Sequence, residues 1–376
     1  MNTPPTGRGL TVVVAPDSFK GSLTSVQVAT ALRDGWLRAR PGDEVLLAPL
    51  ADGGEGTLVA IEAAGGWEWQ ETQAYDPLGR PIRARWLRSA DGMRAALEMA
   101  EASGLSRVAP AERDPIAATS SGTGQLLLGA LSSGVRHVVL GIGGSATTDG
   151  GAGIVEQLGG RIDADAVDLA GFDPRLAELE LRIACDVSNP LLGGKGAAAT
   201  YGPQKGASPQ QVRRLDAALE GWADRLERAT GCRERDTPGA GAAGGVGFAL
   251  LCLRDRFRSL DLVPGVELVM DETDLDGKLA RADLVITGEG RIDEQTAYGK
   301  TALGVARRAH ARGIPTIAVG GGVTAEGIEA LAPFGAVVVP VVERPGSVEE
   351  AMAAGAAPVE RCGERIALLV SLGPSR

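Results

Sequence analysis

The sequence predicts an α/β protein in which a parallel sheet is divided along the chain by a second domain. Near the N-terminus, strand, polar glycine-rich loop and helix follow one another twice, and the same order returns after residue 283. This order is typical of a parallel sheet with helices on its faces. The intervening residues differ and begin with an antiparallel meander. We therefore expect one Rossmann-like domain from residues 1–75 and 278–376. A second α/β domain, residues 76–277, is inserted into it, with the active site in the cleft between them.

The first two strands are predicted at Thr11–Ala15 and Val45–Ala48. A helix follows the first strand, and Thr24 with Gln27 has the spacing of a capping box at its start. Because parallel strands send their following loops to one edge of the sheet, we expect the polar residues of both loops to lie close together. These residues are Asp17, Ser18, Lys20, Asp52 and Glu55.

The middle of the chain is predicted to form a meander, two further strands and several helices. The meander comprises Trp67–Tyr75, Ile82–Arg88 and Met93–Met99; the strands are Arg136–Ile142 and Leu181–Cys185; the helices are Thr119–Leu131, Ser208–Arg228 and Val246–Leu253. Each of the two later strands ends in a polar loop. The first loop is Gly143–Gly151, with the sequence GGSATTDGG, and the second begins at Asp186 beside Asn189.

The last third of the chain begins with a strand at Asp283–Thr287, which we expect to break into a sharp turn at Gly288-Glu289-Gly290. Polar side chains then crowd together before a helix at Thr301–Ala311, namely Arg291, Asp293, Glu294, Thr296 and Lys300. Ligands bind at the carboxyl ends of strands in open α/β sheets, so this stretch is predicted to be half of an active site. Strands at Pro315–Val319 and Ala336–Val341 and a helix at Val359–Leu369 complete the domain.

The composition restricts the partners of the protein. A net charge of −10 and a pI near 5.0 argue against nucleic acid and acidic lipid. No apolar run is long enough to span a membrane, and the N-terminus lacks the features of a signal peptide. The four cysteines are scattered, as expected of reduced thiols in the cytoplasm. Small-molecule substrates and a monomer or homodimer are expected.

Lysine is rare, whereas arginine is common. Only five of the 38 basic residues are lysine, and four of these lie in polar loops rich in glycine and proline: Lys20, Lys195, Lys205 and Lys300. Arginine cannot replace lysine where a compact ammonium group must move with a phosphate, because the guanidinium group is larger and planar. Survival by chance in a biased composition is the alternative.

Several familiar motifs are excluded or weak. Gly239–Gly244 matches G-x-G-x-x-G, but no strand precedes it, so a helix start or an anion-cradling loop is the better interpretation. Gly299-Lys300-Thr301 resembles the end of a Walker A loop, but Glu294 stands where its first glycine belongs. The protein-kinase motifs and the G-x-S-x-G elbow of hydrolases are missing from the sequence. The remaining loops combine glycine, hydroxyl, carboxylate and lysine, as phosphoryl transfer requires.

Seven segments, in order along nearly the whole chain, resemble the bacterial glycerate kinase family. They are APDSFKGSLT (15–24), PLADGGEGT (49–57), GIGGSATTDGG (141–151), ACDVSNPL (184–191), YGPQKGA (201–207), GAAGGVG (241–247) and VITGEGRIDEQTAYGK (285–300). The resemblance implies ATP and Mg²⁺ as cosubstrates. It also implies phosphorylation of D-glycerate to 2-phosphoglycerate, within organic-acid and glyoxylate breakdown. The chain departs from the family at two places. The segment between Gly160 and Asp173 is short where a longer loop is expected, and the first motif reads FKGS where FKES is common.

We predict three groups of site residues. The catalytic group is Asp186 as base, with Asp293 as the alternative, and Lys20, Arg291 and Lys300 to hold the substrate carboxylate or the transferring phosphoryl group. Substrate and phosphate contacts are Asp17, Ser18, Gly143, Gly144, Ser145, Thr147, Asp149, Asn189, Lys205, Gly288, Gly290 and Thr296. Metal ligands are Asp52, Glu55 and Glu289. The alternatives are a kinase of another small hydroxy acid and a non-catalytic sensor that binds sugar acids.

Overall fold

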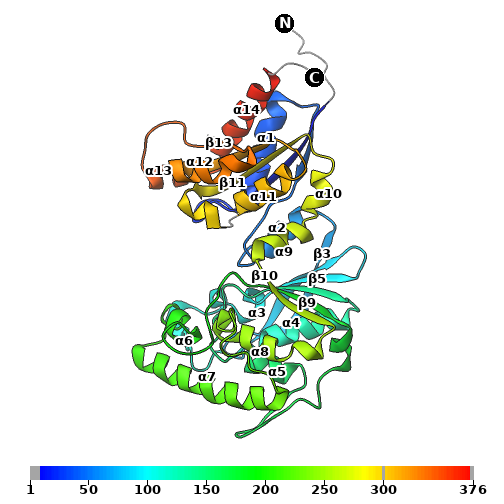
Figure 1. The fold of residues 1–376 in the computed structure, drawn as a ribbon, viewed down its shortest axis with the longest axis vertical. Helices are drawn as coiled ribbons and strands as arrows, with labels where there is room; N and C mark the ends of the chain where they lie inside the picture. The colour runs from blue at the N-terminus through cyan, green and yellow to red at the C-terminus, as the bar shows by residue number, and fades with distance from the viewer. Residues whose placement is uncertain (1–8, 299–300, 373–376) are drawn as a thin grey trace. The chain divides into compact units, whose positions relative to one another are not determined.

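The computed structural model of the protein describes residues 9–298 and 301–372. The chain forms two compact units. The first comprises the residues up to Ala51, Val59–Gly65 and the residues from Val269 onward; the second comprises Asp52–Leu58 and Gly66–Leu268. Each unit contains its own sheet (Figure 1). The predicted fold class, an α/β domain split in sequence by a second α/β domain, is confirmed.

The sheet of the first unit is wholly parallel and has the order β13-β12-β11-β1-β2. Its strands are β1 (Thr11–Pro16), β2 (Glu44–Leu47), β11 (Leu284–Ile292), β12 (Thr316–Val323) and β13 (Val337–Pro340). β1 pairs with both β11 and β2, which lie far apart in sequence. This pairing explains why the order of strand, loop and helix near the N-terminus returns in the last third of the chain.

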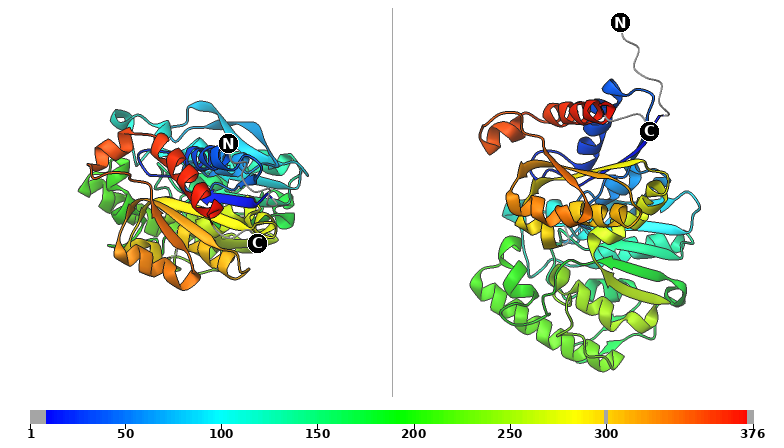
Figure 2. Two further views of the ribbon diagram at one scale, coloured as in Figure 1. Left: turned by 90° about the horizontal axis from the view of Figure 1, so that it is seen from above. Right: turned by 45° about the horizontal axis from the view of Figure 1, so that its top comes forward.

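Helices cover both faces of this sheet. On one face α1 (Ser25–Ala39) packs against α14 (Ala357–Ser371), and the two are seen side by side in Figure 2. Val319 of β12 contributes to the core under these helices. Its neighbour Ala318 belongs to a separate core with α11 (Thr301–His310) and α12 (Ala325–Leu331). Successive side chains of a strand point to opposite faces, so α11 and α12 lie on the other face. The predicted capping box of Thr24 and Gln27 starts α1.

The second unit contains a six-stranded sheet with the order β10-β9-β6-β5-β4-β3. The strands are β3 (Trp67–Tyr75), β4 (Pro81–Ser89), β5 (Arg94–Glu98), β6 (His137–Gly141), β9 (Glu180–Ala184) and β10 (Ser259–Val263). β10, β9, β6 and β5 run parallel, whereas β4 and β3 are antiparallel to their neighbours. A small separate pair is formed by β7 (Arg161–Ile162) and β8 (Val167–Asp168).

One large core joins this sheet to its helices. The main helices are α4 (Ser121–Ser132), α5 (Ala152–Gln157), α7 (Pro209–Thr230) and α8 (Val246–Cys252). Short helices are α3 (Ala100–Ser103) and α6 (Ala197–Tyr201). Remaining helices of the chain are α2 (Thr57–Ala63), α9 (Gly265–Glu272), α10 (Leu275–Leu279) and α13 (Val348–Ala353). No helix among residues 9–298 and 301–372 combines the length and the apolar character needed to cross a membrane.

The sharp turn predicted at Gly288-Glu289-Gly290 is wrong. β11 continues through these residues to Ile292, pairing Glu289 with Gly320 of β12 and Arg291 with Gly322. The glycines serve close packing instead of a turn. A Cβ atom on Gly288 would lie 2.4 Å from Val319 Cγ2, and one on Gly290 would lie 3.1 Å from Phe19 Cα.

The units divide the chain differently from the predicted domain bounds. The prediction places residues 67–75 in the first domain, but this segment is β3, which pairs with β4 along its whole length in the second sheet. Residues Asp52–Leu58 also group with the second unit. The sequence changes at Trp67 from units of strand, loop and helix to a meander of strands, and the pairing of β3 with β4 starts at the same residue.

Candidate active site

In the first unit, Asp17 fixes the loop that follows β1. Its backbone N–H donates to Gly288 O (2.8 Å), and its carboxylate accepts from Thr301 Oγ1 (2.6 Å) and from Ser18 N (2.6 Å). Asp17 therefore joins this loop to β11 and to the start of α11. Lys20, three residues on, is exposed.

The extended end of β11 and the residues after it bring four predicted residues together. The Glu289 carboxyl group is buried and accepts from Thr296 Oγ1 (2.9 Å). Thr296 Oγ1 in turn accepts from Asp293 N (3.2 Å), and Arg291 Nε lies 3.1 Å from Asp293 Oδ2. A Cβ atom on Gly290 would lie 3.4 Å from Lys20 N, so the β1 loop passes next to this strand end. Lys300 lies outside the described residues.

In the second unit, Asp186 follows β9 and is exposed to solvent, although the hydrogen bond of its carboxyl group is partly buried. Its Oδ1 accepts from Gly265 N (3.0 Å). Burial, together with the negative charge of Asp52, raises the pKa of Asp186, although the bond from Gly265 opposes the rise. A Cβ atom on Gly265 would lie 2.0 Å from Asp52 O and 2.9 Å from Asp186 Oδ2. Gly265 therefore packs closely against both aspartates.

Glu98, which the sequence reasoning missed, is the most perturbed carboxyl group near these residues. It is the last residue of β5, is 5% exposed and accepts from Leu58 N (2.7 Å). Burial raises its pKa to about 7, with smaller contributions from Glu101 and Glu55. Asp186 was predicted because it stands at the carboxyl end of a parallel strand. Glu98 has the same position, but the sequence did not reveal that β5 runs parallel to β6.

The Gly143–Gly151 loop follows β6 and is anchored by its own polar residues. Asp149 accepts from Ser120 N and Ser120 Oγ (both 2.8 Å) and from Gly151 N (3.1 Å). Ser145 is buried and accepts from Lys205 Nζ (2.9 Å), which also donates to Thr147 O (2.5 Å). Thr147 and Thr148 are buried as well, and their hydroxyl groups have no hydrogen-bond partner within the described part of the chain.

Two further predicted residues of the second unit have different surroundings. Asn189 joins the segments around it, because its Nδ2 donates to Lys195 O (2.8 Å) and its Oδ1 accepts from the Tyr201 hydroxyl (2.7 Å). Glu55 is exposed, and its charge acts on Glu98.

The carboxylates can accommodate a Mg²⁺ ion that is shared with a substrate. No group of three or more potential metal ligands occurs in the ranges 9–298 and 301–372. Mg²⁺ in phosphoryl-transfer sites is usually bound by one or two carboxylates, with substrate phosphates and water completing the octahedron. Asp52 and Asp186 both lie against Gly265, and the charge of Asp52 acts on Asp186, so the two carboxylates fit that donor set.

The first unit offers carboxylates and a lysine, and the second offers carboxylates and a glycine-rich loop, in each case at the carboxyl ends of parallel strands. These features define an α/β phosphotransferase. The model of the glycerate kinase family matches residues 12–371. The chain belongs to the glycerate kinase family and is an enzyme of the kinase class.

Individual relatives agree with this assignment. The chain is 42% identical to a glycerate kinase of Halalkalibacterium halodurans, over 97% of this chain and 99% of the relative. It is 40% identical to the glycerate 2-kinase of Escherichia coli, over 96% and 98% of the two chains. A crystal structure described as glycerate kinase 2 from Salmonella typhimurium LT2 superimposes with a TM-score of 0.84 at 42% identity. It covers 96% of this chain and 98% of that one.

Proposed function

We propose that the protein transfers the γ-phosphoryl group of ATP to the 2-hydroxyl group of D-glycerate and releases 2-phosphoglycerate and ADP. The observation that carries this proposal is the family match along residues 12–371, supported by a relative that is named for the 2-position. The reaction would serve organic-acid and glyoxylate breakdown in the cytoplasm. The protein would act as a monomer or a homodimer.

Asp186 is the base in this proposal. The oxygen of the 2-hydroxyl group forms a bond to the γ-phosphorus while the bond from that phosphorus to the ADP oxygen breaks, and the hydroxyl proton passes to the carboxylate of Asp186. Its raised pKa brings this carboxylate closer to the working pH, which favours a general base. Asp293, whose Oδ2 lies 3.1 Å from Arg291 Nε, is the alternative base.

The remaining residues bind and orient the substrates. Gly143, Gly144 and Ser145 belong to the loop that would cradle phosphates, and Lys20, Arg291 and Lys300 would neutralise the substrate carboxylate or the transferring group. With Asp186 assigned as the base, Asp52 and Glu55 would hold Mg²⁺. A bound Mg²⁺ ion supplies positive charge to the phosphate oxygens.

Two alternatives make different predictions. A kinase of another small hydroxy acid would have the same loops, and a panel of hydroxy acids would reveal it. A sugar-acid sensor would bind without consuming ATP. The carboxylates at both strand edges favour catalysis, because a binder of an anionic acid gains nothing from additional negative charge.

The decisive experiment measures ADP release from purified protein with Mg²⁺ and ATP, with and without D-glycerate. The product is then passed to enolase without phosphoglycerate mutase. Glycerate-dependent ADP release with direct consumption by enolase would establish the 2-phosphate. ADP release without consumption would indicate the 3-phosphate. Absence of ADP release with every hydroxy acid of the panel would favour the sensor.

A further inference from the structure

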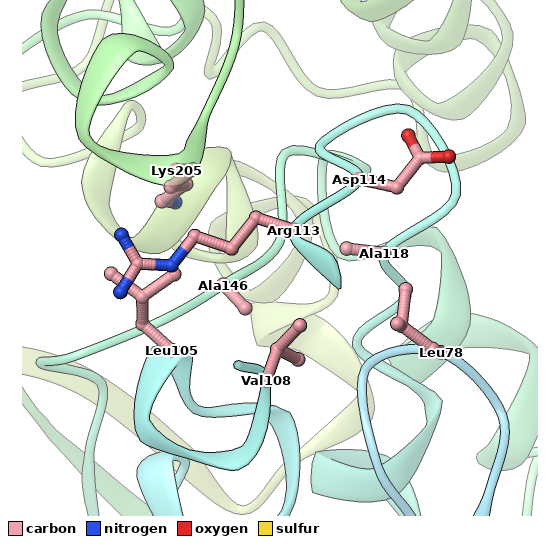
Figure 3. A pocket seen from close by; sticks show the side chains of 8 residues that line it. All are labelled: Leu78, Leu105, Val108, Arg113, Asp114, Ala118, Ala146 and Lys205. Carbon is pink, nitrogen blue, oxygen red and sulfur yellow. The ribbon is translucent and has the colours of Figure 1, made fainter. Parts of the chain in front are cut away.

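Lys205 is a buried cation directly beneath the Gly143–Gly151 loop. It ends a short 3-10 turn, Pro203–Lys205, and only 2% of the residue is exposed. Figure 3 shows Lys205 next to Arg113, and Leu105 and Ala146 of the loop line the same cavity. A lysine is rarely buried unless a specific interaction requires it.

The ammonium group of Lys205 has two acceptors in the middle of the loop. Its Nζ donates to Ser145 Oγ (2.9 Å) and to the main-chain oxygen of Thr147 (2.5 Å). The other charged groups that face it are Asp149, whose negative charge favours the ammonium form, and Arg113 and Asp114, which line the same cavity. Arg113 Nη1 also donates to the main-chain oxygen of Gln204 (3.3 Å), and Gln204 is the residue before Lys205.

Direct contact between Lys205 and a substrate phosphate conflicts with this geometry. The cavity beside it has a volume of about 10 Å³, which is the space that one water molecule needs. A phosphate group is several times larger. Two of the three N–H bonds of the ammonium group are already directed at the loop. Lys205 therefore reaches a ligand only through the loop.

The bond to Thr147 O sets the direction of the next peptide N–H. In a trans peptide the C=O of one residue and the N–H of the next point in opposite directions. Because Lys205 holds the Thr147 oxygen inward, the N–H of Thr148 points away from Lys205. Main-chain N–H groups that point outward from a glycine-rich loop are the usual donors to phosphate.

We propose that Lys205 is a positioning residue that holds the Gly143–Gly151 loop in the conformation that binds the phosphates of the nucleotide. This inference rests on the proposed function, in which that loop cradles the phosphates of ATP. A positive charge beneath the loop also favours an anion on it. Anion binding must in turn favour the charged form of Lys205, because the coupling of two binding equilibria is reciprocal.

The charge on Lys205 gives a readout that a purely structural role does not. Burial lowers the pKa of Lys205 to about 7, so the amine is largely neutral at pH 8. Binding of ADP with Mg²⁺ at pH 8 should raise this pKa and take up protons. Calorimetric titration with ADP and Mg²⁺ in two buffers of different ionisation enthalpy measures this proton uptake.

The test compares wild type with Lys205→Met. We expect the variant to bind ADP at least about tenfold more weakly, because its loop loses two hydrogen bonds from the buried amine. We also expect it to lose the proton uptake and to lose more in kcat/KM for ATP than in kcat. Unchanged ADP affinity and unchanged proton uptake in a folded variant would overturn the proposal.

Lys278→Met is the matched control. Lys278 donates to two main-chain oxygens, Ala64 O (3.0 Å) and Thr273 O (2.7 Å), and burial lowers its pKa to about 8. Both acceptors lie in the first unit. This variant should lose stability but keep the ADP affinity and the proton uptake. Loss of both in Lys278→Met would contradict a role specific to Lys205.

Ser145→Ala provides a second test if Lys205→Met does not fold. It removes one of the two acceptors and keeps the buried amine, so ADP affinity should fall about threefold or more. Unchanged affinity would count against the proposal. If wild-type protein itself binds no ADP in the presence of Mg²⁺, the proposed function fails and this inference fails with it.

Discussion

At the scale of single residues, the second unit places two perturbed carboxyl groups at the ends of its parallel strands. Asp186 follows β9 and Glu98 ends β5, and burial raises the pKa of both. Their hydrogen bonds differ. Asp186 is exposed to solvent and accepts through Oδ1, whereas Glu98 is almost fully enclosed and accepts from the start of α2. Asp186 is therefore the better base, and Glu98 supports the loop at Asp52–Leu58.

Replacing the proposed base should separate catalysis from binding. Asp186→Asn keeps an oxygen for the Gly265 N–H but cannot accept a proton, so kcat should fall about 10²–10⁴-fold with little change in KM for D-glycerate. Steady-state kinetics measure both constants. Asp293→Asn is the companion variant and should lose less. Near-normal turnover in Asp186→Asn would remove it as base, and a larger loss in Asp293→Asn would transfer that role.

Glu98 predicts a pH dependence of stability. Its pKa is about 7 in the folded protein and 4.5 in the unfolded chain. Between these values the folded protein holds a proton that the unfolded chain releases, so raising the pH lowers the free energy of unfolding. The contribution of Glu98 should be complete below pH 4.5 and be lost by pH 7, about 3 kcal/mol at most.

Urea unfolding of wild type and Glu98→Gln at pH 5 and pH 7.5 measures this contribution. The amide keeps an acceptor for Leu58 N but does not titrate, so the variant should lose less stability than wild type over this range. Glu68→Gln, at an exposed position of β3, should behave as wild type. Equal pH dependence in Glu98→Gln and wild type would show that Glu98 titrates normally.

Single residues differ in how far the sequence predicts them. Asp186 was found because it follows an apolar strand directly. Glu98 was missed because its strand looked like part of an antiparallel meander, although it pairs with β4 on one side and runs parallel to β6 on the other. The rarity of lysine singled out Lys205. Its burial depends on packing between segments about 60 residues apart, which local sequence does not encode.

At the scale of elements, the long ends of β11 and β12 place the polar residues of the first unit. A turn and a continued strand both favour glycine, one for a positive φ and the other for close approach. Gly288 and Gly290 do not have positive φ values, and their neighbours lie too close for a side chain. The sequence pattern could not separate the two cases, because the neighbour, Val319, lies some 30 residues away.

Gly288→Ala tests this close packing. The new methyl group would meet Val319 Cγ2 at 2.4 Å and Val319 O at 2.5 Å, so we expect the free energy of unfolding to fall by about 1–3 kcal/mol. Gly322→Ala on β12 is the matched control, since its nearest atom, Arg291 Cγ, lies at an ordinary 3.6 Å. Its change should stay within about 0.5 kcal/mol. Urea unfolding measures both. Equal stability of the two variants would contradict the packing argument.

At the scale of the whole molecule, the proposed reaction predicts a conformational change when the substrates bind. ATP must be shielded from water during transfer, because hydrolysis would otherwise compete. We therefore expect the protein to become more compact when D-glycerate and a nonhydrolysable ATP analogue with Mg²⁺ are both present. Small-angle scattering should show a smaller radius of gyration with both ligands than with either alone. An unchanged radius would be evidence against closure.

The architecture at this scale was largely predictable, because strand, loop and helix alternate in both terminal thirds and the seven family segments keep their order. The residues at which the two units begin and end were less predictable from the sequence. The short segments 52–58 and 59–65 fall in different units although they are adjacent in sequence. A division of this kind depends on contacts between distant segments, and no change of composition marks it.

The burial of Lys205 also makes it a chemical reporter. Amine-reactive reagents acylate exposed lysines such as Lys20 and Lys195 readily, but they cannot reach an amine enclosed beneath a loop. Acylation of Lys205 must wait until the Gly143–Gly151 loop opens. Mass spectrometry can measure the acylation rate of Lys205 relative to that of Lys20. This ratio therefore reports how often the loop opens, without any introduced label.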